Sequence, residues 1–284
     1  MGGYGLASDL EYCVDQLRRL DRDRFLAALA APADLRADLM VLYAFNCEVA
    51  RVRESVSEQM LGLIRLQWWR DAIGEIFAGN PRRHVVVTPL AEMVRRRGLS
   101  QAPFLRLIEA RERDLDNDPP QSVEALEAYA AATSGSLIEL ALEICGVGLR
   151  ERELALARHV GIAYALTGLL RATLYQARDR RLMLPAAVLA ETGVSAGQLF
   201  DLKNQPALRD AVKRMAETAE RHLAAARKLR PARRTIPALL VGRLAAAQLE
   251  QLRRRGYDLF DYRSIEASPL DLWRLGLARL FGRI

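Results

Sequence analysis

Two stretches of the chain carry arginines that could bind a small anion. Arg51 and Arg53 precede Glu54 in AFNCEVARVRESVSE, and Arg171 opens RATLYQARDRRLMLP. A planar guanidinium matches the oxygens of a phosphate and can donate two parallel hydrogen bonds to it. The two stretches therefore predict a metal-free site for a phosphate or a lipid headgroup, provided that the fold brings them together.

Ion pairing inside the protein is the alternative use of these arginines. Arg51 has three glutamates within two helical turns, namely Glu48, Glu54 and Glu58. Arg171 could pair in the same way with a carboxylate on another helix. The sequence leaves both uses open.

The cysteines and histidines do not form a metal-binding pattern. Their spacing matches no zinc-finger, CxxC or HExxH motif, and the positions are Cys13, Cys47, Cys145, His84, His159 and His222. We expect free thiols in a reducing compartment, structural histidines, and no resident metal or other cofactor.

Composition indicates a helical protein. The chain has 284 residues, of which 51% are hydrophobic and only 6% aromatic, and few runs are rich in β-branched residues. The net charge of +7 comes almost entirely from arginine, which suits ion pairing as well as acidic partners. The N-terminus lacks a signal-like segment, and no apolar run approaches the roughly 20 residues that span a bilayer. We expect a soluble protein inside the cell.

Apolar residues recur at helical spacing along almost the whole chain. Leu35, Leu39, Leu42 and Phe45 form one such stripe, and further helices are expected near 61–79, 87–97, 103–115, 122–145, 151–177, 206–229 and 236–255. Proline and glycine punctuate these stretches, and nothing marks a second domain. The sequence therefore predicts a single all-α domain over residues 1–284, with its core at about 22–260 and about eight to ten helices.

The last segment, residues 269–284, has a different pattern. Trp273, Leu277, Leu280 and Phe281 can share one helical face, with three arginines around it. A basic amphipathic helix of this kind can lie in a membrane interface. The alternative is a last helix that docks on the core of the protein.

Four motifs, in this order, resemble the squalene and phytoene synthase family of all-α head-to-head prenyltransferases. They are YAFNCEVARVRESVSE, RLQWWRDAI, LEAYAAATSGSL and GIAYALTGLLRATLYQARDRRLMLP. The resemblance covers residues from about 22 to about 230. It implies an isoprenoid-synthase-type helical bundle around a central cavity. In that family, carboxylates on two facing helices bind Mg²⁺, which grips the diphosphate of the substrate.

The acidic positions of both family motifs are nearly all replaced here. The first motif falls on Ala50, Arg51 and Glu54, and the second on Ala172, Tyr175 and Gln176, so five of the six expected acids are absent. Arg171 and the ending RLMLP remain. One carboxylate cannot assemble a site for several magnesium ions, so we expect a degenerate diphosphate pocket with no catalytic residue.

The resemblance also names the residues of this pocket. Tyr129 matches a tyrosine of the central helix of the family, although core packing is its alternative use. The candidate anion, lipid or degenerate diphosphate pocket then comprises Arg51, Glu54, Tyr129, Arg171 and Tyr175. We expect the cavity either to be packed shut by aliphatic side chains or to hold an apolar prenyl or lipid tail.

One branch of the family is the better match. The phrases AFNCEVARVRESVSEQMLGLIRLQWWRDAI, RERDLD and LLRATLY resemble the mitochondrial complex I assembly factor 6 branch and its bacterial relatives. This resemblance implies a non-catalytic assembly factor for NADH dehydrogenase, with complex I subunits as partners. The alternative is an active prenyltransferase that acts on farnesyl or geranylgeranyl diphosphate, the one case in which Mg²⁺ is expected.

Partners and location follow from the same features. The RRR runs at 95–97 and 253–255 lack any nucleic-acid-binding module, so we expect no nucleic-acid partner. A membrane surface is a possible partner of residues 269–284. The N-terminus favours the cytoplasm of a bacterium, at the inner membrane if the last helix binds there. In a eukaryote, the matrix side of the mitochondrion is expected.

Overall fold

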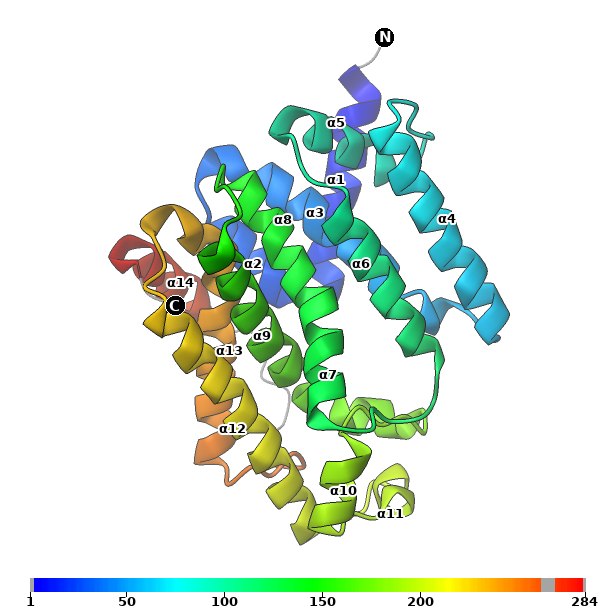
Figure 1. The fold of residues 1–284 in the computed structure, drawn as a ribbon, viewed down its shortest axis with the longest axis vertical. Coiled ribbons are helices and arrows are strands. Elements are labelled where there is room, and N and C mark those ends of the chain that lie inside the picture. Colours follow the sequence, from blue (N-terminus) through cyan, green and yellow to red (C-terminus); the bar gives the residue numbers. More distant parts are fainter. Residues whose placement is uncertain (1–2, 262–268, 283–284) are drawn as a thin grey trace.

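Helices make up the regular structure of residues 3–261 and 269–282, the part of the chain that the computed structural model describes (Figure 1). The α-helices are α1 (Gly3–Leu20), α2 (Arg22–Ala30), α3 (Ala33–Ala50), α4 (Gln59–Phe77), α5 (Val87–Arg97), α6 (Ala102–Ala110), α7 (Val123–Ala130), α8 (Ser136–Ile144), α9 (Glu151–Arg178), α10 (Ala186–Thr192), α11 (Ala196–Phe200), α12 (Pro206–Lys228), α13 (Ile236–Arg254) and α14 (Pro269–Phe281). Short turns lie between them, namely η1 (Arg53–Ser55), η2 (Arg111–Leu115), the π-helical η3 (Ala131–Gly135) and η4 (Arg233–Thr235). The all-α class is confirmed.

The expected number of helices was too low. The described residues contain fourteen α-helices. The N-terminal α1 and α2 and the short α10 and α11 were not anticipated, and η3 divides the expected helix over 122–145 into α7 and α8. The long helices agree closely. Ser122, the N-cap of α7, accepts a hydrogen bond from the Ala125 amide at 3.2 Å.

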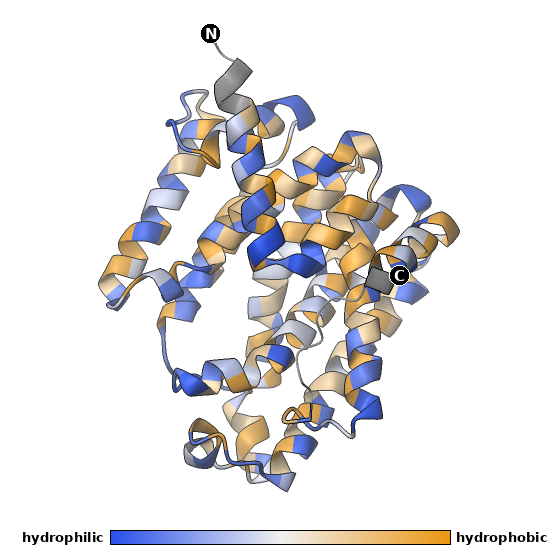
Figure 2. Cartoon of the chain, turned by 180° about the vertical axis from the view of Figure 1, so that it is seen from behind, coloured by the Kyte–Doolittle hydropathy of each residue, from blue (hydrophilic) through white to orange (hydrophobic). Residues whose placement is uncertain are grey.

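Helix α9 lies in the middle of the bundle and packs against α8, α12, α13 and η3 (Figure 1). Apolar and polar residues share most helices, as amphipathic packing requires (Figure 2). Two groups of buried apolar side chains form the core, and both α9 and α13 contribute to each of them. In the first group, the rings of Trp69 and Phe104 meet Phe45 edge-on.

Glycines allow α9 and η3 to approach closely. A Cβ at Gly161 would lie 2.4 Å from the amide nitrogen of Gly135 and 2.5 Å from its Cα. Only a residue without a side chain fits there, so Gly161 sets the position of η3 against α9. Thr133 and Ser134, which belong to η3, are thereby fixed beside α9.

The terminal helix α14 docks on the bundle against α2 and α13 (Figure 1). Leu275 and Ala278 are buried in this contact. Docking of the last helix, one of the two expectations for this segment, is therefore confirmed for the described residues. Among the helices described, none combines the length and the apolar character that crossing a membrane requires.

Candidate functional site

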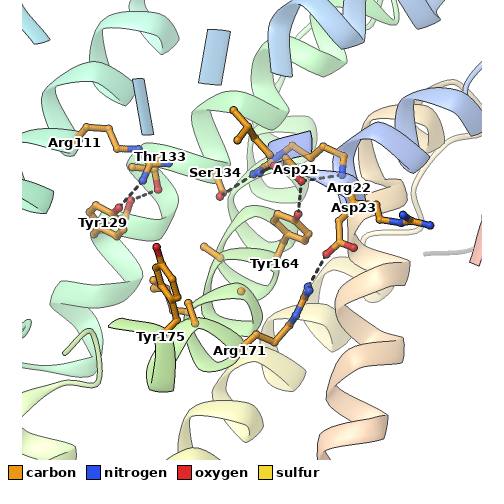
Figure 3. A pocket seen from close by; sticks show the side chains of 16 residues that line it. Asp21, Arg22, Asp23, Arg111, Tyr129, Thr133, Ser134, Tyr164, Arg171 and Tyr175 are labelled. Carbon is orange, nitrogen blue, oxygen red and sulfur yellow. Dashed lines mark hydrogen bonds and ion pairs between the residues drawn. The ribbon is translucent and has the colours of Figure 1, made fainter. Parts of the chain in front are cut away.

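A cavity of about 670 Å³ lies between the start of α2, α7 with η3, and the middle of α9 (Figure 3). We call it the central cavity. Its charged lining residues are Asp21, Arg22, Asp23, Arg24, Arg111 and Arg171, and its other polar ones are Tyr129, Thr133, Ser134, Tyr164 and Tyr175. The cavity is thus neither packed shut nor purely apolar.

Arg171 reaches across this cavity from α9 to the first turn of α2. Its Nη1 donates to Oδ2 of Asp23 at 2.7 Å (Figure 3). From α13, Nε2 of Gln248 donates to the same oxygen at 2.8 Å. Asp23 is only 8% exposed, so this carboxylate is held by two donors away from bulk water. The expectation that Arg171 pairs with a carboxylate on another helix is confirmed.

A second ion pair, between Arg24 and Asp21, also lines the central cavity. Arg24 Nη1 donates to Oδ2 of Asp21 at 2.5 Å, and its Nη2 lies 3.4 Å from Oγ of Ser134. The guanidinium also lies over the Tyr164 ring, 4.6 Å from its centroid. Burial alone would lower the pKa of Arg24, but Asp21 outweighs it and the net direction is upward, so the guanidinium stays charged.

Tyr129 belongs to a third polar group, at the η2 side. Its hydroxyl donates to Oδ1 of Asp114 at 2.7 Å and accepts from Nη1 of Arg111 at 2.8 Å. Burial, and then the Asp114 carboxylate, raise the pKa of Tyr129 above its ordinary value although Arg111 opposes the change. The hydroxyl therefore stays protonated and acts as a bridge between Arg111 and Asp114 rather than as a base.

Tyr175 is the most open of the expected site residues. Its side chain is 60% exposed and its ring points toward the Tyr129 side of the central cavity (Figure 3). Arg171 and Tyr175 lie one helical turn apart on α9, so they share a face of that helix. Tyr129, Arg171 and Tyr175 are thus brought together, as expected.

Arg51 and Glu54 lie elsewhere. Helix α3 ends at Ala50, and the Ser55 hydroxyl donates to the carbonyl of Val52 at 2.8 Å in the turn that follows. Arg51 lines a separate hollow of about 290 Å³ with Trp68 and His84, among others. Its Nε is 3.4 Å from Oε2 of Glu54, so the alternative of local ion pairing is confirmed for Arg51. The five expected pocket residues are therefore divided between two places.

The donor set does not fit the magnesium site that the family resemblance implies. The described residues hold no group of three histidine, cysteine or carboxylate side chains arranged for a metal ion. The cavity carboxylates Asp21 and Asp23 already accept hydrogen bonds from Arg24 and Arg171. Glu54, the one acid left at a motif position, lies in η1 and pairs with Arg51. No step of magnesium chemistry can be derived from these residues.

The acids and arginines at the start of α2 were not expected to line the cavity. Asp21, Asp23 and Arg24 form part of the run DRDR, which looks like an exposed alternation of charges. The available signal was helix capping: Asp21 is the N-cap of α2, and its Oδ1 accepts from the Arg24 amide at 3.0 Å. Capping could have located the helix start, but not the cavity behind it.

Comparisons with known proteins agree with this architecture. The chain is 35% identical over 260 residues to the rat (Rattus norvegicus) "NADH dehydrogenase (ubiquinone) complex I, assembly factor 6", covering 91% of this chain and 78% of that protein. It is 29% identical over 239 residues to the presqualene diphosphate synthase of Rhodopseudomonas palustris, covering 82% and 84%.

Solved structures give the same fold. A dehydrosqualene synthase crystallised with a ligand superposes with a TM-score of 0.82 at 20% identity, covering 98% of this chain and 97% of that one. The family model for squalene/phytoene synthase matches residues 17–274. From this match and the relatives, the chain belongs to the squalene/phytoene synthase family.

Proposed function

We propose that this chain is a non-catalytic member of the family that acts as an assembly factor for respiratory complex I. The observation that carries the proposal is the Asp23–Arg171 ion pair in the central cavity. A diphosphate leaving group needs cationic partners that balance its charge as the carbon–oxygen bond breaks. Here the motif arginine is matched by a carboxylate of the protein itself, and the magnesium-binding acids are replaced.

The relatives support the same proposal. The assembly factor of rat is matched at higher identity and over more of this chain than the presqualene diphosphate synthase. Complex I subunits are the partners that this proposal implies. The proposed location is the cytoplasmic side of a bacterial inner membrane, or the matrix side of the mitochondrial inner membrane if the source is a eukaryote.

The alternative is a prenyltransferase with a rebuilt diphosphate site. The volume of the central cavity supports this alternative, because aliphatic side chains do not fill the cavity and a ligand could occupy it. Arg171 and Tyr175 would then face a diphosphate, or the cavity would hold a prenyl or lipid tail without chemistry.

Incubation with prenyl diphosphates separates these functions. Purified protein is incubated with farnesyl or geranylgeranyl diphosphate, with and without Mg²⁺, and pyrophosphate release and hydrocarbon or alcohol products are measured. We expect no product in either condition. A product that disappears in Arg171→Gln or Glu54→Gln would overturn the non-catalytic assignment.

A genetic experiment tests the assembly role directly. Deletion of the gene should lower the amount of assembled complex I on native gels, and the wild-type gene should restore it. Glu54→Gln, which removes the last motif acid, should restore it equally well. Assembly that is normal after deletion would contradict the proposed role, whatever the outcome of the prenyl diphosphate assay.

A further inference from the structure

The terminal helix α14 carries a second apolar face that nothing in the described structure covers. Trp273, Leu277, Leu280 and Phe281 are between 52% and 76% exposed. Their spacing of four, seven and eight residues places them on one side of a helix. Leu275 and Ala278, which are buried against the bundle, lie on the opposite side. Helix α14 is therefore apolar both on the face that packs against the bundle and on the face that is exposed to solvent.

Specific contacts fix which way this face points. Nη1 of Arg279 donates to the carbonyl of Ala30 at the end of α2, at 2.8 Å. Nη2 of Arg233 donates to the carbonyl of Leu280 at 3.0 Å. Both bonds lie in the last turn of α14 and join it to α2 and to η4. The exposed apolar side chains therefore point outward as a set, which we call the α14 apolar face.

A cationic segment lies next to this face. Residues 227–234 contain five basic side chains and no acid, and all five are exposed: Arg227, Lys228, Arg230, Arg233 and Arg234. The Arg233 bond to α14 places this segment beside the helix. An apolar strip with exposed arginines and a lysine at its border is complementary to an anionic lipid surface, which offers headgroup phosphates outside and acyl chains within.

Charge argues against a second copy of the chain as the occupant. The protein carries a net charge of +7, and a symmetric dimer through α14 would bring two such basic segments together. An anionic surface instead gains from every one of these cations, by roughly fivefold in binding for each residue near the surface.

We propose that the α14 apolar face and residues 227–234 form a binding surface for an anionic phospholipid bilayer. Helix α14 lies in the plane of the interface with Trp273, Leu277, Leu280 and Phe281 at the boundary between headgroups and acyl chains. The basic segment contacts the headgroup phosphates. This inference concerns a surface outside the central cavity and does not depend on the assembly role.

Vesicle flotation tests the proposal with the full chain. Vesicles of phosphatidylcholine mixed with phosphatidylglycerol should carry the protein upward in a density gradient, and vesicles of phosphatidylcholine alone should carry much less. Added salt should weaken the binding, because it screens the cationic segment. Trp273→Ser with Leu277→Ser, and separately Lys228→Glu with Arg234→Glu, should each weaken binding by at least about tenfold.

A matched control comes from α4. Met60 and Ile64 are also exposed, at 64% and 58%, so Met60→Ser with Ile64→Ser removes two exposed apolar side chains from another helix. This double variant should float like the wild type. Circular dichroism should be unchanged in all variants, because the changed side chains lie outside the core.

Fluorescence provides a second measurement that does not depend on the amount bound. Brominated lipids should quench part of the tryptophan emission, and Trp273→Phe should abolish that quenching because Trp68 and Trp69 lie on α4. Equal flotation with neutral vesicles, or serine variants that bind as tightly as the wild type, would overturn the proposal. So would α14 variants that turn a dimer into a monomer without changing flotation.

Discussion

Asp23→Ala tests whether the ion pair in the central cavity holds the helices together. Asp23 accepts from Arg171 on α9 and from Gln248 on α13, at 2.7 and 2.8 Å, and lies in the first turn of α2. Removing it costs two hydrogen bonds to a charged acceptor and the favourable interaction of a carboxylate with a helix N-terminus.

The magnitude follows from burial. Breaking a fully buried pair costs about 3–5 kcal/mol. The Arg171 side chain is 30% exposed, while that of Asp23 is 10% exposed, so solvent screens part of the interaction. We therefore expect Asp23→Ala to lower the free energy of unfolding by about 2–3 kcal/mol, which corresponds to a fall in Tm of several degrees.

The assay is urea denaturation followed by far-UV circular dichroism, with Asp15→Ala as the matched control. Asp15 pairs with Arg18 at 2.7 Å, but the two side chains are 49% and 58% exposed. Such a surface pair contributes at most about 1 kcal/mol. The double variant Asp23→Ala with Arg171→Ala should lose less than the sum of the two single variants, because the pair is counted once.

Equal midpoints for Asp23→Ala and Asp15→Ala, at unchanged denaturant slope, would refute this account. The pair would then contribute nothing to folding, and stability would not explain why Asp23 faces Arg171. That result would favour the prenyltransferase alternative over the assembly role.

Three further variants or conditions test the packing around α9 and the buried titratable groups. Gly161→Ala should lower the free energy of unfolding by about 2–3 kcal/mol, because the new Cβ would clash with the Gly135 backbone. Gly168→Ala, whose Cβ would meet nothing within 4 Å, should be neutral or stabilising by up to about 1 kcal/mol. Urea denaturation measures both. Burial, together with a neighbouring histidine, lowers the pKa of His159 below its ordinary 6.5. As the pH falls below about 6.5, His159 therefore binds a proton in the unfolded chain more readily than in the folded chain. The free energy of unfolding should decrease over this pH range. In His159→Asn, the urea midpoint should depend less on pH. Burial raises the pKa of the Cys47 thiol to about 12, so iodoacetamide should label it only under denaturing conditions, as mass spectrometry can show.

The long helices and the loss of the motif acids could be predicted because both are local properties of the chain. Helical spacing located α9, α12 and α13 to within a residue or two at each end. The replacement of acids at Ala172, Tyr175 and Gln176 needs only an aligned motif. Neither prediction depends on knowing what lies across the cavity.

The partner of Arg171 could not be predicted in this way. Asp23 is 148 residues distant in the chain, and its neighbours in the DRDR run give no sign that one carboxylate faces a cavity. Arg51 failed to join the pocket for a similar reason, since α3 ends at Ala50 and the chain turns away. The partly outward orientation of α14 likewise depends on bonds that Ala30 and Arg233 make with it.

The geometry of Asp23 explains why a surviving motif arginine does not indicate catalysis. One oxygen of this carboxylate joins α2 to α9 through Arg171 and to α13 through Gln248. A partly buried cation without a countercharge is costly. Asp23 supplies the countercharge, and the residue becomes a brace between three helices. Under the proposed non-catalytic function, the side chain that binds an anion in an enzyme is kept for stability, and the acids around it distinguish the two cases.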